Sequence, residues 1–333
     1  MMTTDVLAFD EAEIEVMLAN LDSFSEEEVA EIDRMVDELN VRAVNKGAYD
    51  DLIEFCKLMM PEFIVGKHHR ILADMLMAIE SGDEDRICVN IPPRHGKSQL
   101  VSIFFPAWFL GRNPDKKVMM VSHTTDLAVD FGRKVRNLIA LDAYRSIFPT
   151  VKLAQDSKSA GRWNTNVGGE YYACGIGSAL AGRGADLLLV DDPHSEQDVI
   201  NGNFGVFEKA YEWFTFGART RLMPGGRVAI IQTRWHLDDL TGRVVRDMGK
   251  NERADQYNVV EFPAILDIED KKTKKTVQKP LWPEFFDLEA LLRTKASMPV
   301  FQWNSQYQQK PTTEEAAMVK REWWKKWIPD SPP

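Results

Sequence analysis

Apolar residues along the chain alternate between short continuous runs and helical patterns. Continuous apolar runs with polar borders are typical of strands buried on both faces of a sheet. Such runs lie near residues 86–91, 117–122, 170–174, 186–191, 227–232 and 257–262. Between them, apolar residues recur every three or four positions, which predicts helices. These patterns lie near 97–110, 124–140, 204–217 and 238–248. The alternation predicts an α/β fold with a mostly parallel central sheet flanked by helices.

Further helical patterns precede this alternating core. Residues 10–40 predict one or two acidic amphipathic helices, and Ser25 with Glu28 matches a capping box. Residues 48–82 also have a helical pattern. The acidic helices are interpreted either as a docking element for a partner protein or as a solvated appendage.

The charge is distributed unevenly. Residues 1–40 contain 13 acidic residues and one basic residue, a net charge of −12, whereas the whole chain carries −10. The remaining residues therefore carry about +2, so the acidic balance belongs to the N-terminal segment. The chain lacks the overall basic charge typical of nucleic-acid-binding domains, and any DNA contact must come from a local patch. The run at 269–279 is basic, and is interpreted as a solvated hairpin or, alternatively, a DNA-facing loop.

Cysteine spacing and hydropathy exclude several classes of protein. Cys56, Cys88 and Cys174 form no CxxC pair, so neither a disulfide framework nor a structural zinc site is expected. A reducing cytoplasm fits this pattern. No apolar run reaches the roughly 18–20 residues of a membrane-spanning helix, and the acidic N-terminus does not match a secretion signal.

Residues 91–98 match part of a phosphate-binding turn that follows a predicted strand. Gly96 allows the backbone to approach phosphate oxygens, Lys97 is expected to reach the β- and γ-phosphates, and Ser98 to coordinate Mg²⁺. The full pattern has a glycine five residues earlier, where this chain has Ile91. An ordinary turn with a solvated lysine is the alternative. The candidate nucleotide contacts in the turn are Pro93, Arg94, His95, Gly96, Lys97, Ser98 and Gln99.

A second motif places two carboxylates at the end of an apolar strand. The run 187–190 is followed by Asp191 and Asp192, at the edge where open α/β sheets bind ligands. Asp191 is the predicted metal-side carboxylate, and Asp192 is the predicted activator of the attacking water. A glutamate is common at the second position, so Glu196 is a possible substitute. Alternatively, Asp192 only caps the following turn.

Arginines near these motifs are candidates for gripping phosphates. Arg94 lies inside the turn, and its guanidinium has the fork geometry that binds phosphate. Arg183 is flanked by glycines eight residues before Asp191, so it is a candidate arginine finger that reaches a neighbour's γ-phosphate. An arginine that only fixes its loop is the alternative. Arg133 and Arg219 are lesser candidates.

Polar residues also end the predicted strand at 227–232. Gln232 and Thr233 are positioned to read the γ-phosphate and pass its state to another part of the molecule. Capping of the next helix by Thr233 or Asp238 is the alternative, with Trp235 and His236 packed beneath that helix.

The order and spacing of these motifs resemble the ATPase domain of tailed-phage terminase large subunits. The resemblance extends from about Phe63 to Trp327. The matching stretches are His68–Arg70, Pro92–Ser98, Gly182–Asp186, Val190–Pro193, Gln232–His236 and Gln306–Pro311.

This resemblance implies a P-loop NTPase of the RecA/ASCE-like type that hydrolyses ATP with Mg²⁺. It implies an α/β core over 46–264 after an N-terminal extension over 1–45, then a small lid and linker subdomain over 265–333. It places the adenine near Phe63 and His68, with His69 beside them; a structural role of the two adjacent histidines is the alternative. The nuclease domain of full-length large terminases is expected to be absent, and no nuclease activity is expected.

The resemblance also implies partners and a location. They are double-stranded DNA, the portal ring of a procapsid, the small terminase subunit and further copies of the chain, with a monomer expected in isolation. The expected location is the host cytoplasm and, transiently, the portal. Two other functions fit the motifs less well: a helicase-like or repair ATPase, and a nucleotide-binding scaffold with little hydrolysis, which Ile91 and Asp192 favour.

Overall fold

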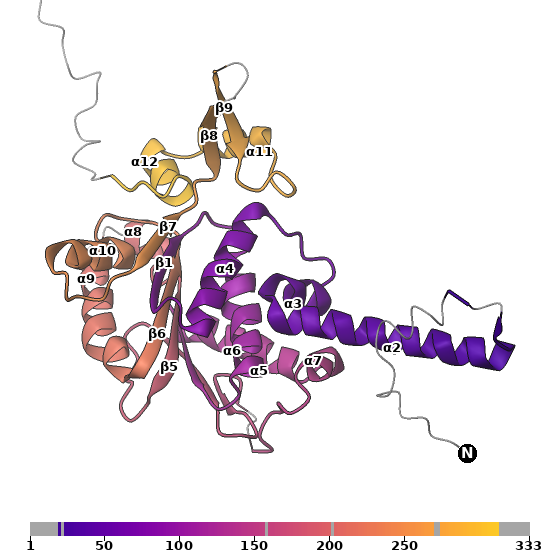
Figure 1. The fold of residues 1–333 in the computed structure, drawn as a ribbon. Coiled ribbons are helices and arrows are strands. Elements are labelled where there is room, and N and C mark those ends of the chain that lie inside the picture. Colours follow the sequence, from indigo (N-terminus) through magenta and orange to yellow (C-terminus); the bar gives the residue numbers. More distant parts are fainter. Residues whose placement is uncertain (1–18, 21–22, 157–158, 201–202, 270–273, 313–333) are drawn as a thin grey trace, which may run out of the picture.

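A seven-stranded sheet forms the centre of the molecule. The computed structural model describes residues 19–20, 23–156, 159–200, 203–269 and 274–312. The strand order is β3-β4-β2-β5-β6-β1-β7, with helices on both faces of the sheet (Figure 1). All neighbouring strands are parallel except β3 and β4, which are antiparallel. The predicted α/β class with a mostly parallel sheet is confirmed.

The strands follow the predicted apolar runs closely. They are β1 (Arg86–Asn90), β2 (Lys117–Ser122), β4 (Glu170–Gly175), β5 (Ala185–Asp191), β6 (Leu222–Gln232) and β7 (Asn258–Glu261). The short edge strand β3 (Arg162–Asn164) was not predicted, and its Trp163 ring stacks on Tyr171 of β4 with centroids 4.9 Å apart. Strand β6 begins five residues earlier than predicted, because a register shift opposite Ala185 and Leu187 accommodates its glycines.

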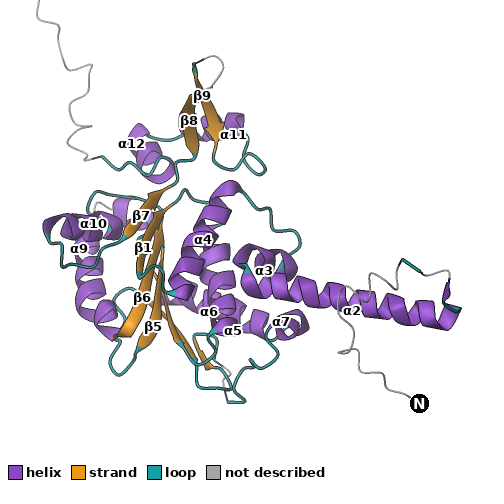
Figure 2. Cartoon of the chain, viewed as in Figure 1, coloured by secondary structure: helices purple, strands orange, loops and turns teal. Residues whose placement is uncertain are grey.

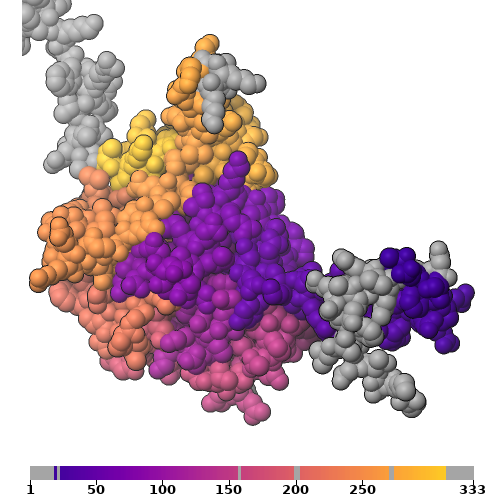
Figure 3. Space-filling model, viewed as in Figure 1, coloured from indigo at the N-terminus to yellow at the C-terminus, as the bar shows by residue number. Residues whose placement is uncertain are grey.

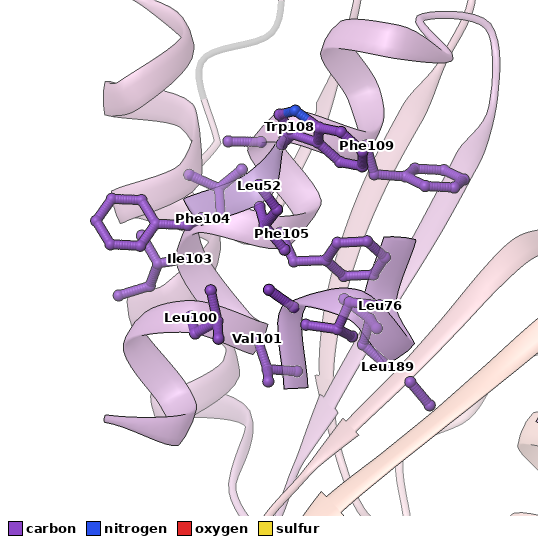
Figure 4. Close-up of a cluster of buried hydrophobic side chains, with 14 of the residues drawn as sticks. Leu52, Leu76, Leu100, Val101, Ile103, Phe104, Phe105, Trp108, Phe109 and Leu189 are labelled. Atoms are coloured by element: carbon purple, nitrogen blue, oxygen red, sulfur yellow. The ribbon is translucent and has the colours of Figure 1, made fainter. Parts of the chain in front are cut away.

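Alternate residues of each central strand face two separate cores, as a sheet covered on both sides requires. One core lies under α3 (Leu52–Met59), α4 (Lys67–Ser81), η3 (Gln99–Phe104), α5 (Phe105–Arg112), α6 (Thr125–Ile139) and α7 (Asp142–Ile147). Figure 4 shows Leu100 and Val101 of η3 in this core with Leu189 of β5. The opposite core lies under η4 (Trp213–Ala218) and α10 (Leu240–Lys250). The remaining elements on that side are α8 (Glu196–Ile200), α9 (Gly205–Glu212) and η5 (Arg219–Arg221). The layers are seen in Figure 2.

The N-terminal part of the described chain is one long helix, α2 (Glu26–Asp50). The predicted capping box is present, since the Ser25 hydroxyl accepts from the Glu28 N–H and the Glu28 carboxylate accepts from the Ser25 N–H. Helix α2 extends away from the body of the molecule (Figures 1 and 3). The first part of the predicted acidic helices, residues 10–18, lies outside the described residues.

A small unit follows the sheet. It consists of the hairpin β8 (Ile265–Glu269) and β9 (Thr276–Pro280), then α11 (Leu288–Ala296), α12 (Val300–Gln302) and η6 (Trp303–Tyr307). Its own core contains Ala264, Ile265, Leu291 and Trp303. The basic run at 269–279 includes the end of β8 and most of β9, in agreement with its interpretation as a hairpin, and its residues 270–273 lie outside the described residues. The part of the expected lid and linker subdomain beyond residue 312 lies outside the described residues. Within the described part of the chain, no helix is long and apolar enough to span a membrane.

Candidate active site

Four neighbouring strands end in polar residues at one edge of the sheet. Asn90 of β1 is in register with Gln232 of β6, and Asp191 of β5 is in register with Ile231. Asn90, Ser122 of β2, Asp191 and Gln232 are all buried, and each has at least one polar side-chain atom without a hydrogen-bond partner. Buried polar atoms are rarely left unpaired, so this edge is a candidate site for a polar ligand.

The turn from 91 to 98 starts directly at this edge. Arg94 and Gly96 have positive φ angles of 63° and 77°. A Cβ at position 96 would collide with Nε2 of His69, so only glycine fits. At position 91 the backbone instead continues the sheet, because the Ile91 N–H donates to Gln232 O at 3.0 Å. Ile91 does not have a positive φ angle, so this position does not need a glycine, and its apolar side chain is fully buried.

Two buried histidines, both on α4, contact the backbone of the turn. Nε2 of His68 and Nε2 of His69 lie 3.1 Å and 3.0 Å from the His95 carbonyl oxygen. Nδ1 of His69 accepts from the Gly66 N–H, so its Nε2 carries the proton and donates to that carbonyl. Burial lowers the pKa of His69 to about 3 and also lowers the pKa of His68. Both rings are therefore neutral supports of the turn. The adenine contact expected of His68 stays a prediction.

Lys97 and Asp192 face each other across the site. Lys97 Nζ lies 2.8 Å from Asp192 Oδ2, and the lysine is buried. Burial alone would lower the lysine pKa, but Asp192 and Asp191 raise it above its ordinary value. The other oxygen of Asp192 accepts from the Thr233 N–H at 2.8 Å, and the Thr233 hydroxyl donates to Ile91 O at 3.1 Å. The turn, the carboxylates and the end of β6 are thus one hydrogen-bonded unit.

Asp191 has the properties expected of a metal-side carboxylate. Burial, and then the charge of Asp192, raise its pKa to about 6, while Lys97 and two serine hydroxyls act in the opposite direction. Its Oδ2 accepts from the Ser102 hydroxyl at 2.6 Å, and its Oδ1 is buried without a partner. Mg²⁺ usually takes one or two carboxylates and completes its shell with water and substrate phosphates. Asp191 Oδ1 and the Ser98 hydroxyl fit that donor set, and no cluster of three acidic, histidine or cysteine ligands occurs among the described residues.

A pocket of about 320 Å³ opens beside the turn. Four of the predicted nucleotide contacts, Phe63, Arg94, Gly96 and Gln99, line it. Two further lining residues, Trp282 and Phe285, were not predicted, and their rings stack with centroids 4.5 Å apart. The aromatic cluster in Trp282–Phe286 was the available signal. His95, from the turn itself, stacks on the neighbouring Phe286 at 5.0 Å.

Arg183 lies at the other end of β5. It precedes the first residue of that strand, so it is roughly 20 Å from Asp191 at the rise of a strand. Its guanidinium lies 3.8 Å above the Tyr172 ring and 3.6 Å from Glu170. It therefore does not reach the site of its own chain. Arg133 pairs with Asp130 on α6, and Arg219 pairs with Asp255 at 2.8 Å. Glu196 is exposed at the start of α8, four residues beyond Asp192.

The segment after β6 is organised by Asp239, which the sequence analysis missed. Asp239 caps α10, because its carboxylate accepts from the Gly242 N–H. The alternative that Thr233 or Asp238 caps this helix is therefore wrong. The buried Arg234 bonds to Asp239 at 2.9 Å, and the Arg234 N–H donates to the Gln309 side chain at 3.1 Å. His236 stacks on Phe207, whereas Trp235 donates its backbone N–H to Asp239. The strand tip is therefore connected directly to the C-terminal unit.

Comparisons with known proteins find one family model and several solved structures that are similar to this chain. Residues 88–203 match the family model described as terminase large subunit, T4likevirus-type, N-terminal. Among solved structures, the HK97 bacteriophage large terminase is similar with a TM-score of 0.47 and 14% identity, over 75% of this chain and 52% of that chain. The Thermus phage P74-26 large terminase ATPase domain has a TM-score of 0.44 and 15% identity, over 71% and 92%. A search of curated proteins finds no match.

A third similar structure is a large terminase from a thermophilic bacteriophage in complex with ATP-gamma-S. Its TM-score is 0.44 at 11% identity, over 72% of this chain and 51% of that chain. The chain thus spans about half the length of this protein and of the HK97 protein. Residues 88–203 therefore match the N-terminal region of the terminase large subunit family, the family that the motifs of the sequence resemble.

Proposed function

We propose that the chain is an ATPase motor that moves double-stranded viral DNA into a procapsid. The observation that carries the proposal is the joint position of Lys97, Asp191 and Asp192 at one sheet edge, beside the turn. The family match over 88–203 supports the biological setting. The expected partners are the portal ring, the small terminase subunit and further copies of the chain, in the host cytoplasm and transiently at the portal.

The residues of the turn are assigned to nucleotide binding. The N–H groups of the turn and the Lys97 ammonium bind the phosphates, and the pocket lined by Phe63, Trp282 and Phe285 takes the base. Arg94 lines the same pocket and is free to grip a phosphate. Asp191 and Ser98 would hold Mg²⁺, which supplies charge neutralisation of the phosphates when bound.

Asp192 is assigned to orienting the attacking water. In the described state its two oxygens are occupied by Lys97 Nζ and the Thr233 N–H. Binding of phosphates by Lys97 would free Oδ2 to accept a proton from water. Gln232, whose side-chain atoms are buried without partners, is next to this group and is assigned to sensing the γ-phosphate.

Arg183 is assigned to the neighbouring subunit's site. Arg183 is too far from Asp191 of the same chain to act there without a large rearrangement. In a ring of subunits, it would instead act at the site of the neighbouring subunit. Its pairing with Glu170 and Tyr172 is then the resting position of a finger.

The test is ATP hydrolysis with Mg²⁺ as a function of chain concentration, for the wild type, Lys97→Ala and Arg183→Ala. Turnover that rises faster than linearly with concentration and is lost in both variants is the expected result. Linear turnover that is insensitive to Arg183→Ala would leave the ATPase and contradict the finger. ATP binding without turnover, even with portal and DNA added, would favour the nucleotide-binding scaffold.

Two further assays examine the remaining assignments. Unwinding of a forked duplex would favour the helicase-like alternative over the packaging motor. We also propose that these residues do not cleave DNA, and metal-dependent nicking of a plasmid by the purified chain would contradict that.

A further inference from the structure

The helix that follows the phosphate turn begins with a π-helical segment, η3. At its end the Phe105 N–H donates to the Leu100 carbonyl, five residues earlier, whereas an α-helical bond joins residues four apart. Such segments are rare and frequently occur at functional sites. Leu100, Val101, Ile103 and Phe104 of η3 are buried apolar residues of the core. Ser102 is a fully buried polar residue in the middle of this apolar stretch.

The Ser102 hydroxyl has one strong interaction. It donates to Oδ2 of Asp191 at 2.6 Å, the short distance typical of a hydroxyl bound to a carboxylate. A buried hydroxyl without a partner would cost free energy, so this bond explains why serine is tolerated among apolar neighbours. Ser98, four residues earlier and on the same side of the helix, is near enough to lower the pKa of the same carboxyl group, although of the two serines only Ser102 makes a hydrogen bond to it.

The two serines and the two carboxylate oxygens have different surroundings. Oδ2 of Asp191 is bound by Ser102, whereas Oδ1 is buried and has no partner. Ser98 belongs to the phosphate turn, where the hydroxyl is expected to move onto the metal. Ser102, in contrast, lies outside the turn, and its hydroxyl is free to stay on Asp191 when the metal binds.

We propose that Ser102 is a positioning residue for the metal-side carboxylate: it anchors Oδ2 of Asp191 and thereby leaves Oδ1 for the Mg²⁺ of the bound nucleotide. This inference rests on the proposed function, because it concerns the same site. Ser102 itself touches neither metal nor nucleotide. Its effect is to fix the carboxylate before the ligand arrives, so that metal binding does not have to order it.

The experiment measures metal binding apart from turnover. Mn²⁺ replaces Mg²⁺, and its binding to the protein saturated with ATP-gamma-S is followed by water-proton relaxation. Nucleotide binding without metal is measured in EDTA with a fluorescent ATP analogue. The variants are Ser102→Ala, the conservative Ser102→Thr, and Ser305→Ala as a control that removes another buried serine hydroxyl, far along the chain in η6. Thermal unfolding of each variant establishes that it is folded.

The expected result is that Ser102→Ala weakens Mn²⁺ binding by about 10- to 100-fold, the range for losing an outer-shell partner of a metal ligand. Binding of the nucleotide in EDTA stays at the wild-type level, Ser102→Thr restores most of the Mn²⁺ affinity, and Ser305→Ala behaves as wild type. Unchanged Mn²⁺ binding in a folded Ser102→Ala protein would overturn the inference. Equal losses of nucleotide affinity with and without metal would also overturn it, because they indicate a general structural role. A wild type that forms no metal–nucleotide complex would overturn the proposed function first, and this inference with it.

Discussion

The two edges of the central sheet differ in how completely their polar side chains are paired. At the edge where the strands begin, the charged groups are paired: Arg86 and Arg227 donate to backbone carbonyls, and Asp186 accepts from the Lys117 N–H and pairs with Lys116. The Nε atoms of Arg86 and Arg227 have no hydrogen-bond partner, but each guanidinium keeps other bonds. At the edge where the strands end, the buried side chains of Ser122 and Gln232 have no partner among the described residues, and Asn90 and Asp191 each keep one unpaired atom. The difference shows which edge contributes to folding and which edge is kept available for a ligand.

Arg183 is the one residue at the starting edge to which we assign a role in turnover, so it gives the largest expected effect. Arg183→Ala should lower ATP hydrolysis in the assembled motor by about 10³-fold or more, as for other arginine fingers. At dilutions where chains do not associate, the variant and the wild type should hydrolyse ATP equally slowly. A loss of the same size under dilute conditions would assign Arg183 to folding of its own chain.

At the edge where the strands end, the next largest effect is expected for Lys97. Lys97→Ala should lower kcat by about 10²–10³-fold, because a charge that stabilises the transition state is removed. Unlike Arg183→Ala, it should do so at every chain concentration. The matched control is Lys116→Ala at the starting edge, whose ion pair is partly exposed. If both lysine variants lost activity to the same extent, the contrast between the edges would be wrong.

Buried neutral histidines should make the ending edge sensitive to acid. Burial lowers the pKa of His69 to about 3, and of His95 and His194 to about 4. Their folded-state pKa values lie below the unfolded value, so their contribution is complete above about pH 6.5 and is lost as the pH falls toward 4 and 3. Each should cost about 2 kcal/mol of unfolding free energy between pH 7 and pH 5.

Urea unfolding at the two pH values measures this loss. His69→Gln keeps a donor and an acceptor at this position but cannot titrate, so its loss between pH 7 and pH 5 should be about 2 kcal/mol smaller than that of the wild type. An identical pH dependence in the variant would mean that His69 does not stay neutral in the folded protein.

The smallest effect is expected at the starting edge itself. Lys116→Ala removes a partly exposed ion pair with Asp186, so unfolding free energy should fall by less than about 1 kcal/mol. Asp186 keeps its bond from the Lys117 N–H at 2.8 Å. Thermal unfolding at low and high salt checks this, and a much larger loss would show that the pair is structurally essential.

The sequence was sufficient for features whose chemistry is local. Gly96, Lys97 and Ser98 are contiguous, and Asp191 and Asp192 directly end an apolar strand, so the residues themselves predicted their meeting at one sheet edge. Six strands followed from the apolar runs, whereas the order of the strands in the sheet was not predicted. The start of β6 was missed because Pro224, Gly225 and Gly226 predict a turn, which the sheet accommodates by a register shift.

Features that depend on long-range contacts were not predictable. His68 and His69 precede His95 by 27 and 26 positions, and their contact with the turn is set by burial against the His95 carbonyl. Trp282 and Phe285 reach the pocket from beyond the sheet, and Arg234 meets Gln309 across 75 positions of sequence. No periodicity records such contacts, because each depends on how separate elements come together in the fold.

Thr233 links two segments of the site that are far apart in the sequence. Its hydroxyl donates to the Ile91 carbonyl at the start of the phosphate turn, and its N–H donates to the Asp192 carboxylate. A single residue is therefore a rigid link between the turn and the carboxylates. The relative position of turn and carboxylates is consequently fixed when the protein folds. The ordering entropy is lost once, at folding, and does not have to be supplied again in every catalytic cycle.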